Sequence, residues 1–183
     1  MEDDTGKIRT EKNHVYFYSE VDRSSTYELI ECLRIAERYC LKLCYETKID
    51  SLPIYLHISS YGGCVDSALN VVDHIQASRF PVYTVIEGYT ASSGTIISVV
   101  GKKRFIRPHA SMLIHQVSSE FWGKMVELED QIVNLKQAML KIKRIYKKTT
   151  KIPKRQLAAL LKHDLMLNSK KCIELGLVDE IWK

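Results

Sequence analysis

The residues best suited to chemistry are two adjacent serines, Ser92 and Ser93, in the stretch Gly-Tyr-Thr-Ala-Ser-Ser-Gly at residues 88–94. An apolar β-branched run at residues 82–86 predicts a strand before them, and an apolar segment at residues 96–100 predicts a buried helix after them. A hydroxyl at such a junction lies beside free helix N-terminal amides, which can bind the oxyanion of an acyl-transfer intermediate. Helix capping is the simpler explanation of the two serines, since serine is a preferred N-cap residue. This stretch alone leaves both interpretations open.

A nucleophilic serine needs a base to accept its proton and a third group to orient that base. Among the six histidines, His115 ends the apolar strand predicted at residues 112–114, and strand ends commonly carry functional groups in α/β folds. His57 and His74 lie inside predicted core elements, which indicates structural, hydrogen-bonded roles. Asp164 follows a predicted helix and is the candidate orienting acid, although an ordinary helix-terminal aspartate is the simpler interpretation.

A pair of glycines, Gly62 and Gly63, follows the buried strand predicted at residues 53–59. Glycines at that place let the backbone approach a bound molecule closely, with free amides pointing at it. An ordinary turn into the amphipathic helix predicted at residues 65–77 explains them equally well.

The alternation of strands and helices predicts one α/β domain. The polar residues 1–13 predict a flexible arm, and residues 14–183 form the domain. Further strands are expected at residues 14–18, 105–106, 112–114 and 177–181; further helices are expected from Ser24 or Ser25, at residues 124–148, from Pro153 and from Ser169.

Composition excludes several classes of protein. The 183 residues, 45% of them hydrophobic, suit a single domain, and the net charge of +5 is moderate. No run approaches the roughly 18 apolar residues of a membrane span, and the acidic start argues against targeting peptides. The five cysteines form no Cys-x-x-Cys pair, which indicates reduced, buried thiols in a cytoplasmic protein and no zinc site. Nine of the twenty residues at 136–155 are basic; acidic residues just upstream favour a solvated helical face over a nucleic-acid surface.

Five motifs, in order, give the chain a family resemblance. They are Ser-Ser-Tyr-Gly-Gly at residues 59–63, the serine stretch at 88–94, Met-Leu-Ile-His-Gln at 112–116, Asp-Leu-Met-Leu at 164–167 and Glu-Leu-Gly-Leu-Val-Asp at 174–179. Together they resemble the ClpP peptidase family, the proteolytic subunit of the ATP-dependent Clp protease. The resemblance implies that Ser92 is the nucleophile, that His115 is the general base and acid, and that Asp164 fixes the imidazole tautomer. It also implies that the oxyanion is bound by the backbone amides of Gly63 and Ser93.

The resemblance further implies a fold and an assembly. The fold is a superhelix of repeated strand-helix units, as in the crotonase superfamily, and residues 124–148 form a protruding handle that joins two rings of seven subunits. A stripe on that helix suits packing: Leu128, Ile132, Leu135, Met139, Ile142 and Tyr146. The implied function is a serine endopeptidase that cleaves unfolded polypeptides or short peptides inside the ring chamber, without cofactor or metal and without membrane or nucleic acid.

No phosphate-binding loop motif occurs, so any ATP-driven unfolding would come from a separate AAA+ ATPase, and the short N-terminal arm lacks the family's hydrophobic anchor. Two alternatives are a catalytically silent ring subunit and a crotonase-type acyl-CoA enzyme. The complete set of serine, histidine and aspartate argues against both.

The chain departs from the family pattern near the expected substrate groove. Gly62, Gln116, Val117 and Ser118 align with substrate-binding positions, but Tyr61 and Val117 stand where the family has proline and Ser93 where it has methionine. Residues 118–123 replace a glycine-rich strand that pairs with substrate. The two aromatic residues of this segment, Phe121 and Trp122, either pack against the start of the long helix or line the groove. Gly123 before the helix favours packing.

Overall fold

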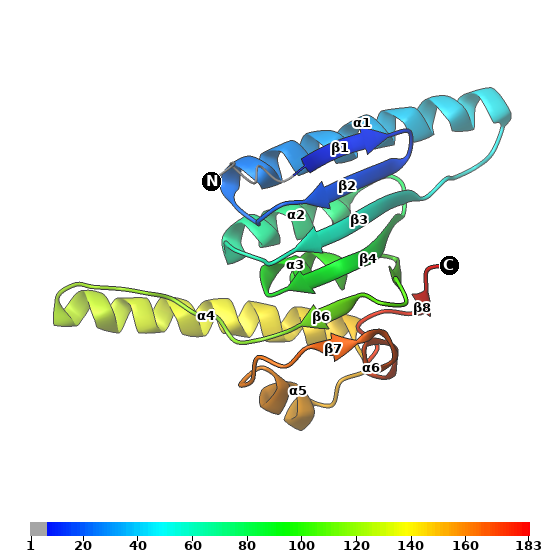
Figure 1. Cartoon of the computed structure of the whole chain (residues 1–183). Coiled ribbons are helices and arrows are strands. Elements are labelled where there is room, and N and C mark those ends of the chain that lie inside the picture. The colour runs from blue at the N-terminus through cyan, green and yellow to red at the C-terminus, as the bar shows by residue number, and fades with distance from the viewer. Residues whose placement is uncertain (1–6) are drawn as a thin grey trace, which may run out of the picture.

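An eight-stranded mixed sheet organises the chain (Figure 1), whose computed structural model describes residues 7–183. The main strand order is β1-β2-β3-β4-β5-β8, and β6 and β7 extend the sheet beside β4. The predicted α/β class is confirmed. The strands are β1 (Lys7–Glu11), β2 (His14–Tyr18), β3 (Ile54–Ser60), β4 (Val82–Ala91), β5 (Lys103–Ile106), β6 (Ser111–Leu113), β7 (Leu167–Asn168) and β8 (Glu180–Ile181).

Helices alternate with the strands. They are α1 (Arg23–Thr47), α2 (Val65–Ala77), α3 (Ser93–Ser98), α4 (Met125–Thr149), α5 (Lys154–Leu160) and α6 (Ser169–Glu174). The strands β2, β3, β4, β5 and β8 run parallel to one another, because a helix or a long connection returns the chain between them. Within residues 7–183, no helix has both the length and the apolar character required to span a membrane.

The hydrophobic core lies between the sheet and the helices α1, α2 and α3. Alternate residues of β3 make this visible: Ile54, Leu56 and Ile58 are fully buried, whereas Tyr55 is half-exposed on the opposite face. A strand places successive side chains on opposite faces, so one face of β3 meets the helices. The opposite face of the sheet carries stacked aromatic rings and histidines instead.

Strand β4 spans both halves of the sheet and carries the chain to the serine stretch. Its first part, up to Ile86, pairs with β5, and its last part, from Tyr89 to Ala91, pairs with β6. Between the two parts, Gly88 has a φ of +58°, and the register between β3 and β4 shifts at the same level. The change of neighbour brings the ends of β4 and β6 together, and with them Ser92 and His115.

Three local expectations are corrected by the structure. Residues 7–11, predicted as part of a flexible arm, form the edge strand β1, antiparallel to β2; residues 1–6 of that arm lie outside the described residues. Helix α1 is capped by Asp22, whose side chain accepts from the Ser25 amide at 2.7 Å, rather than by Ser24 or Ser25. The predicted burial of the thiols fails at Cys64, which is exposed at the start of α2, and Cys44 is half-buried.

A chain of polar side chains crosses the open face of the sheet. His14 Nδ1 lies 2.9 Å from His57 Nε2, and His57 Nδ1 lies 3.1 Å from a Glu87 carboxylate oxygen. Tyr18 donates a hydrogen bond to the same carboxylate, and the Arg107 Nε–H donates to it at 3.1 Å. His57 is therefore a buried, hydrogen-bonded core histidine, as predicted. Burial lowers the pKa of both His14 and His57, although Glu87 acts to raise the pKa of His57.

These lowered pKa values predict that acidification destabilises the fold. A histidine in the unfolded chain has a pKa of about 6.5, so below that pH the unfolded state binds more protons than the folded state. We expect the free energy of unfolding to fall as the pH drops from 7.5 to 5.5, measured by urea denaturation. His57→Gln should flatten the slope, and His109→Gln, at an exposed position, should preserve it. A His57→Gln slope equal to that of the unmodified chain would contradict the prediction.

Candidate active site

Ser92 sits on a strained turn between β4 and α3. Its φ of 53° and ψ of −128° are unusual for a residue with a side chain, and such strain of about 1–3 kcal/mol is typical of functional sites. The turn is held on both sides: the Ser92 amide donates to the Leu113 carbonyl at 2.9 Å, and the Ser92 carbonyl accepts from the Thr95 hydroxyl at 2.6 Å. The Ser92 hydroxyl makes no capping hydrogen bond to α3, so simple helix capping does not explain it.

The structure brings Ser92, His115 and Asp164 together from three separate parts of the chain. His115 Nε2 lies 2.8 Å from the Ser92 hydroxyl, and His115 Nδ1 lies 3.3 Å from Asp164 Oδ1. His115 directly follows the strand β6 and its buried neighbour Ile114, whereas Asp164 lies on the turn after α5 with 75% of its side chain exposed. This arrangement puts the imidazole within hydrogen-bond distance of the serine hydroxyl on one side and within ion-pair distance of the Asp164 carboxylate on the other.

The two glycines form a second turn that is packed directly against Ser92. A side chain at Gly62 would place its Cβ 2.6 Å from Ser92 Cβ and 3.1 Å from the Ser93 amide nitrogen. A Cβ at Gly63 would collide with the Val21 carbonyl oxygen, and the φ values of 100° and 139° also require glycine. The turn is fixed because the Val21 amide donates to the Gly62 carbonyl at 2.7 Å.

Two backbone amides near the serine have no acceptor within the described part of the chain. Within residues 7–183, neither the Gly63 amide nor the Ser93 amide donates a hydrogen bond, and Ser93 is the first residue of α3. The Ser93 hydroxyl is buried and also lacks a partner among those residues. Unpaired amides beside a hydroxyl nucleophile are the groups that stabilise a developing oxyanion.

The segment after His115 lies along α4, as Figure 1 shows. The Gln116 amide donates to the Leu161 carbonyl at 2.7 Å, and the Val117 amide lies 3.1 Å from Met139 Sδ. Val117 and Ser118 line a cavity of about 540 Å³ together with Gly63. Gln116 lines a neighbouring cavity against α4 that Val117 also borders, so three of the four predicted substrate-binding residues border two hollows, and Gly62 lines neither of them.

Sequence reasoning missed two side chains beside this site, Tyr89 and Cys64, and named a third, Tyr61, only as a departure from the family pattern. The rings of Tyr61 and Tyr89 lie 5.5 Å apart, and burial together with the Asp164 carboxylate raises the pKa of Tyr89. Cys64 lines the same cavity as Gly63, and hydrogen bonds from Ser67 lower the pKa of its exposed thiol. Tyr61 carries a visible signal, because it replaces a proline of the resembled motif. The other two depend on the pairing of strands distant in sequence.

The predicted inward packing of Phe121 and Trp122 is wrong for the tryptophan. The Trp122 side chain is 98% exposed, and Phe121 lies close over Gly123 while remaining half in solvent. The close approach between Phe121 and Gly123 is the tight turn that the glycine was expected to allow. That turn directs the neighbouring Trp122 away from the domain, near the start of α4.

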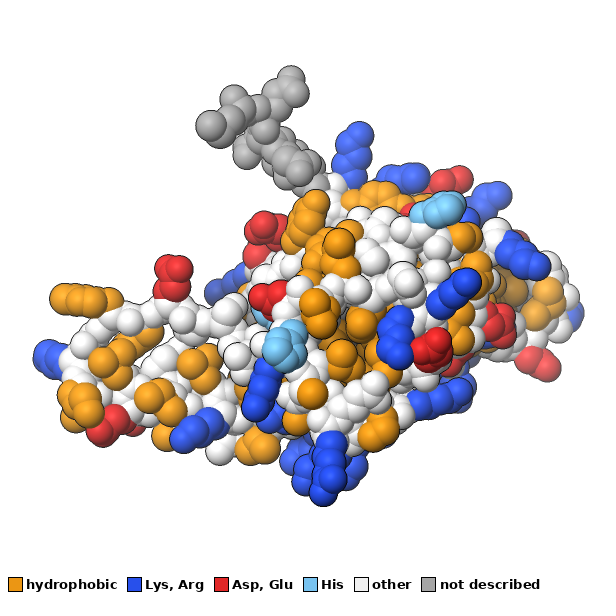
Figure 2. Space-filling view, turned by 60° about the horizontal axis from the view of Figure 1, so that its bottom comes forward, with side chains coloured by type: hydrophobic (Ala, Val, Ile, Leu, Met, Phe, Trp, Pro, Cys, Tyr) orange, Lys and Arg blue, Asp and Glu red, His pale blue; other side chains and the backbone are white. Residues whose placement is uncertain are grey.

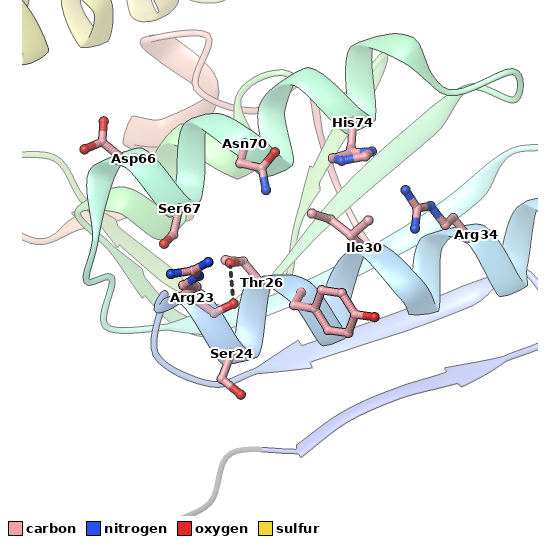
Figure 3. Close-up of a pocket in the computed structure, with 10 residues that line it drawn as sticks. Arg23, Ser24, Thr26, Ile30, Arg34, Asp66, Ser67, Asn70 and His74 are labelled. Carbon is pink, nitrogen blue, oxygen red and sulfur yellow. Dashed lines mark hydrogen bonds between the residues drawn. The ribbon is translucent and has the colours of Figure 1, made fainter.

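The cavity of about 730 Å³ between α1 and α2 is separate from this site (Figure 3), and Ser92, His115 and Asp164 do not line it. In Figure 3, Arg23 and Arg34 reach toward it from α1, and Asn70 and His74 reach toward it from α2. Among residues 7–183, no group of three or more metal-binding side chains comes together.

Comparison with known proteins shows which family this chain resembles. The family model described as Clp protease matches residues 7–183. The ATP-dependent Clp protease proteolytic subunit 2 of Treponema denticola is 34% identical over 133 residues, which are 72% of this chain. The aligned part spans 66% of the length of that relative.

The packing of the glycine turn predicts a specific loss. Gly63→Ala should lower the melting temperature and strongly reduce labelling of Ser92 by a fluorophosphonate, because the added methyl group collides with the Val21 backbone and displaces the turn that packs against Ser92. Gly88→Ala is the matched control: its φ is also positive, but the nearest atom to the added Cβ lies 3.6 Å away. Gly88→Ala should carry only the conformational cost of about 1–2 kcal/mol and keep the labelling. Equal labelling of both variants would contradict the prediction.

Proposed function

The chain belongs to the Clp protease family, and on that premise we propose that it is a serine peptidase that cleaves unfolded polypeptides or short peptides. The contact that carries the proposal is the 2.8 Å approach of His115 Nε2 to the Ser92 hydroxyl. That contact also argues against a catalytically silent ring subunit and against an acyl-CoA enzyme, because neither needs a base on a serine.

In the proposed mechanism, Ser92 Oγ attacks the carbonyl carbon of the scissile peptide bond while His115 Nε2 takes the hydroxyl proton. The tetrahedral oxyanion is stabilised by the amides of Gly63 and Ser93. The C–N bond then breaks, and His115 gives its proton to the leaving amine. A water molecule attacks the acyl-enzyme in the same way and releases Ser92. Asp164 keeps the proton of the imidazole on Nδ1 and stabilises the charged imidazolium throughout.

We also propose that the peptidase works as an assembly of stacked rings, joined through α4. This helix covers residues 125–149, where the sequence predicts 124–148, and only its second half is rooted in the domain. Of the predicted packing stripe, Ile142 and Tyr146 are buried in this chain, whereas Ile132 is exposed. Figure 2 shows hydrophobic side chains along the projecting part of the molecule. The exposed ones near this end are Trp122, Met125, Val126, Ile132 and Val133.

The proposed chamber would contain peptidase sites but no ATPase site that could unfold substrates. The relative from Treponema denticola carries the words ATP-dependent in its name, whereas this sequence lacks a phosphate-binding loop motif. We therefore infer that a separate AAA+ ATPase delivers folded substrates, and that short peptides are cleaved without it.

Replacement of the nucleophile tests the chemistry. Ser92→Ala should abolish fluorophosphonate labelling and lower peptide hydrolysis by about 10⁴-fold or more, and His115→Ala should be nearly as inactive, since triad members act as a unit. Ser93→Ala is the matched control, because its proposed contribution is a backbone amide that alanine retains. Persistent labelling and activity in Ser92→Ala would overturn the assignment.

A charge on α4 tests the assembly. Ile132→Glu should halve the native mass, because burying an unpaired carboxylate between two rings costs several kcal/mol. Ile49→Glu makes the same change at a similarly exposed isoleucine outside α4 and should keep the mass. Native mass spectrometry separates the two results. A monomer that is fully active without any assembly would contradict the ring proposal and leave the catalytic assignment intact.

A further inference from the structure

Another hollow lies at the junction of α4 and α5, and no residue of the proposed active site lines it. Its volume is about 320 Å³. The lining combines two kinds of side chain, long cations and small aliphatic groups. The lining residues are Leu140, Lys143, Arg144, Lys147, Ile152, Lys154, Leu157 and Ala158.

The positive charge around this hollow has no counter-charge. No acidic side chain lines it, and within residues 7–183 none of its four cations forms an ion pair with a carboxylate. Lys143 and Lys147 are four residues apart on one helix, an arrangement in which like charges repel. The groove in Figure 3 differs, because Asp66 lies on its wall and Arg34 pairs with Glu31 at 2.5 Å.

The cations and the two buried aliphatic groups occupy different depths. Ile152 and Leu157 are buried, whereas the side chains of Lys143, Lys147 and Lys154 are exposed. The hollow therefore has an apolar floor and a positively charged mouth. The attraction of α4's C-terminus for cations explains Lys147, but it reaches only the last turn and does not explain Lys143.

The lining also selects among anionic ligands. None of its residues is aromatic, so it offers no ring on which a nucleotide base could stack. An aliphatic floor suits an aliphatic chain, which gains by leaving water. At about 30 Å³ for each water-sized group, a volume of 320 Å³ holds roughly ten such groups.

We propose that the α4–α5 hollow binds a small aliphatic carboxylate of about eight carbon atoms. The chain lies over Ile152 and Leu157, and the carboxylate is held by the lysines at the mouth. This site is independent of the proposed peptidase chemistry, because Ser92, His115 and Asp164 do not line it.

The probe is octanoate, added to the full chain and followed by isothermal titration calorimetry. Octanoate should bind saturably in the submillimolar range, whereas octanol lacks the charge and acetate lacks the chain, and both should bind at least about tenfold more weakly. Lys143→Gln combined with Lys147→Gln should weaken octanoate binding about tenfold or more, since a hydrogen bond to a charged group is lost. The matched control combines Lys141→Gln with Lys148→Gln, which changes the net charge equally but lies outside the hollow, and should preserve binding.

A second pair of variants tests the floor without changing charge. Ala158→Phe should block octanoate binding by filling the hollow, and Ala159→Phe, at the next exposed position, should not. The proposal is overturned by absence of saturable binding, by equal affinity for octanol, or by equal weakening in the paired controls. Displacement of octanoate by a single-stranded oligonucleotide would also overturn it, because the basic stretch would then be a nucleic-acid surface.

Discussion

The close packing of two turns, one after β3 and one after β4, is the constraint on which the rest of the site depends. Gly62 and Ser92 approach so closely that no side chain fits between them. This contact exists because β3 and β4 are neighbours in the sheet and because Ser60 pairs with Thr90 just before the chains turn. The Thr90 hydroxyl donates to the Ile58 carbonyl at 3.0 Å and locks the two strand ends together. The position of Ser92 relative to the amides of Gly63 and Ser93 is thus a property of strand register.

The sequence predicts those parts of the site that depend on residues close together along the chain. Ser92, His115 and the glycine pair each follow an apolar strand, and the resemblance to the ClpP family predicts their grouping. Asp164 illustrates the limit, because it lies on an exposed turn whose distance from His115 depends on how α5 packs beneath the segment after His115. The contact of Tyr61 with Tyr89 is invisible for the same reason. Cys64 lies outside the apolar helical patterns that hold the other four cysteines, and the structure places it at the start of a helix on a cavity wall.

The apolar stripe on α4 shows that a sequence pattern can predict the spacing of apolar residues correctly without predicting which of them are buried in the same chain. Its members recur at helical intervals, which predicts one apolar face. The domain covers that face in the second half of the helix, where Ile142 and Tyr146 are buried and Met139 contacts the segment after His115. Beyond them the helix leaves the sheet, as Figure 1 shows, and the same apolar face continues into solvent. Helical periodicity predicts that a helix has an apolar face. It does not predict whether that face is buried by the same chain or by another one.

The C-terminal half of α4 contacts the segments that hold Ser92 and His115, which its sequence does not suggest. Tyr146 is fully buried and its hydroxyl lies 2.5 Å from the Thr95 hydroxyl, which in turn donates to the Ser92 carbonyl. Farther along, Met139 accepts from the amide two residues after His115. A helix of 25 residues is about 37 Å long. The half of α4 that packs on the domain contacts both the serine turn and the segment after His115, and the other half projects away from them. A ligand bound at the distant tip of α4 would therefore act on the Ser92 turn without occupying it.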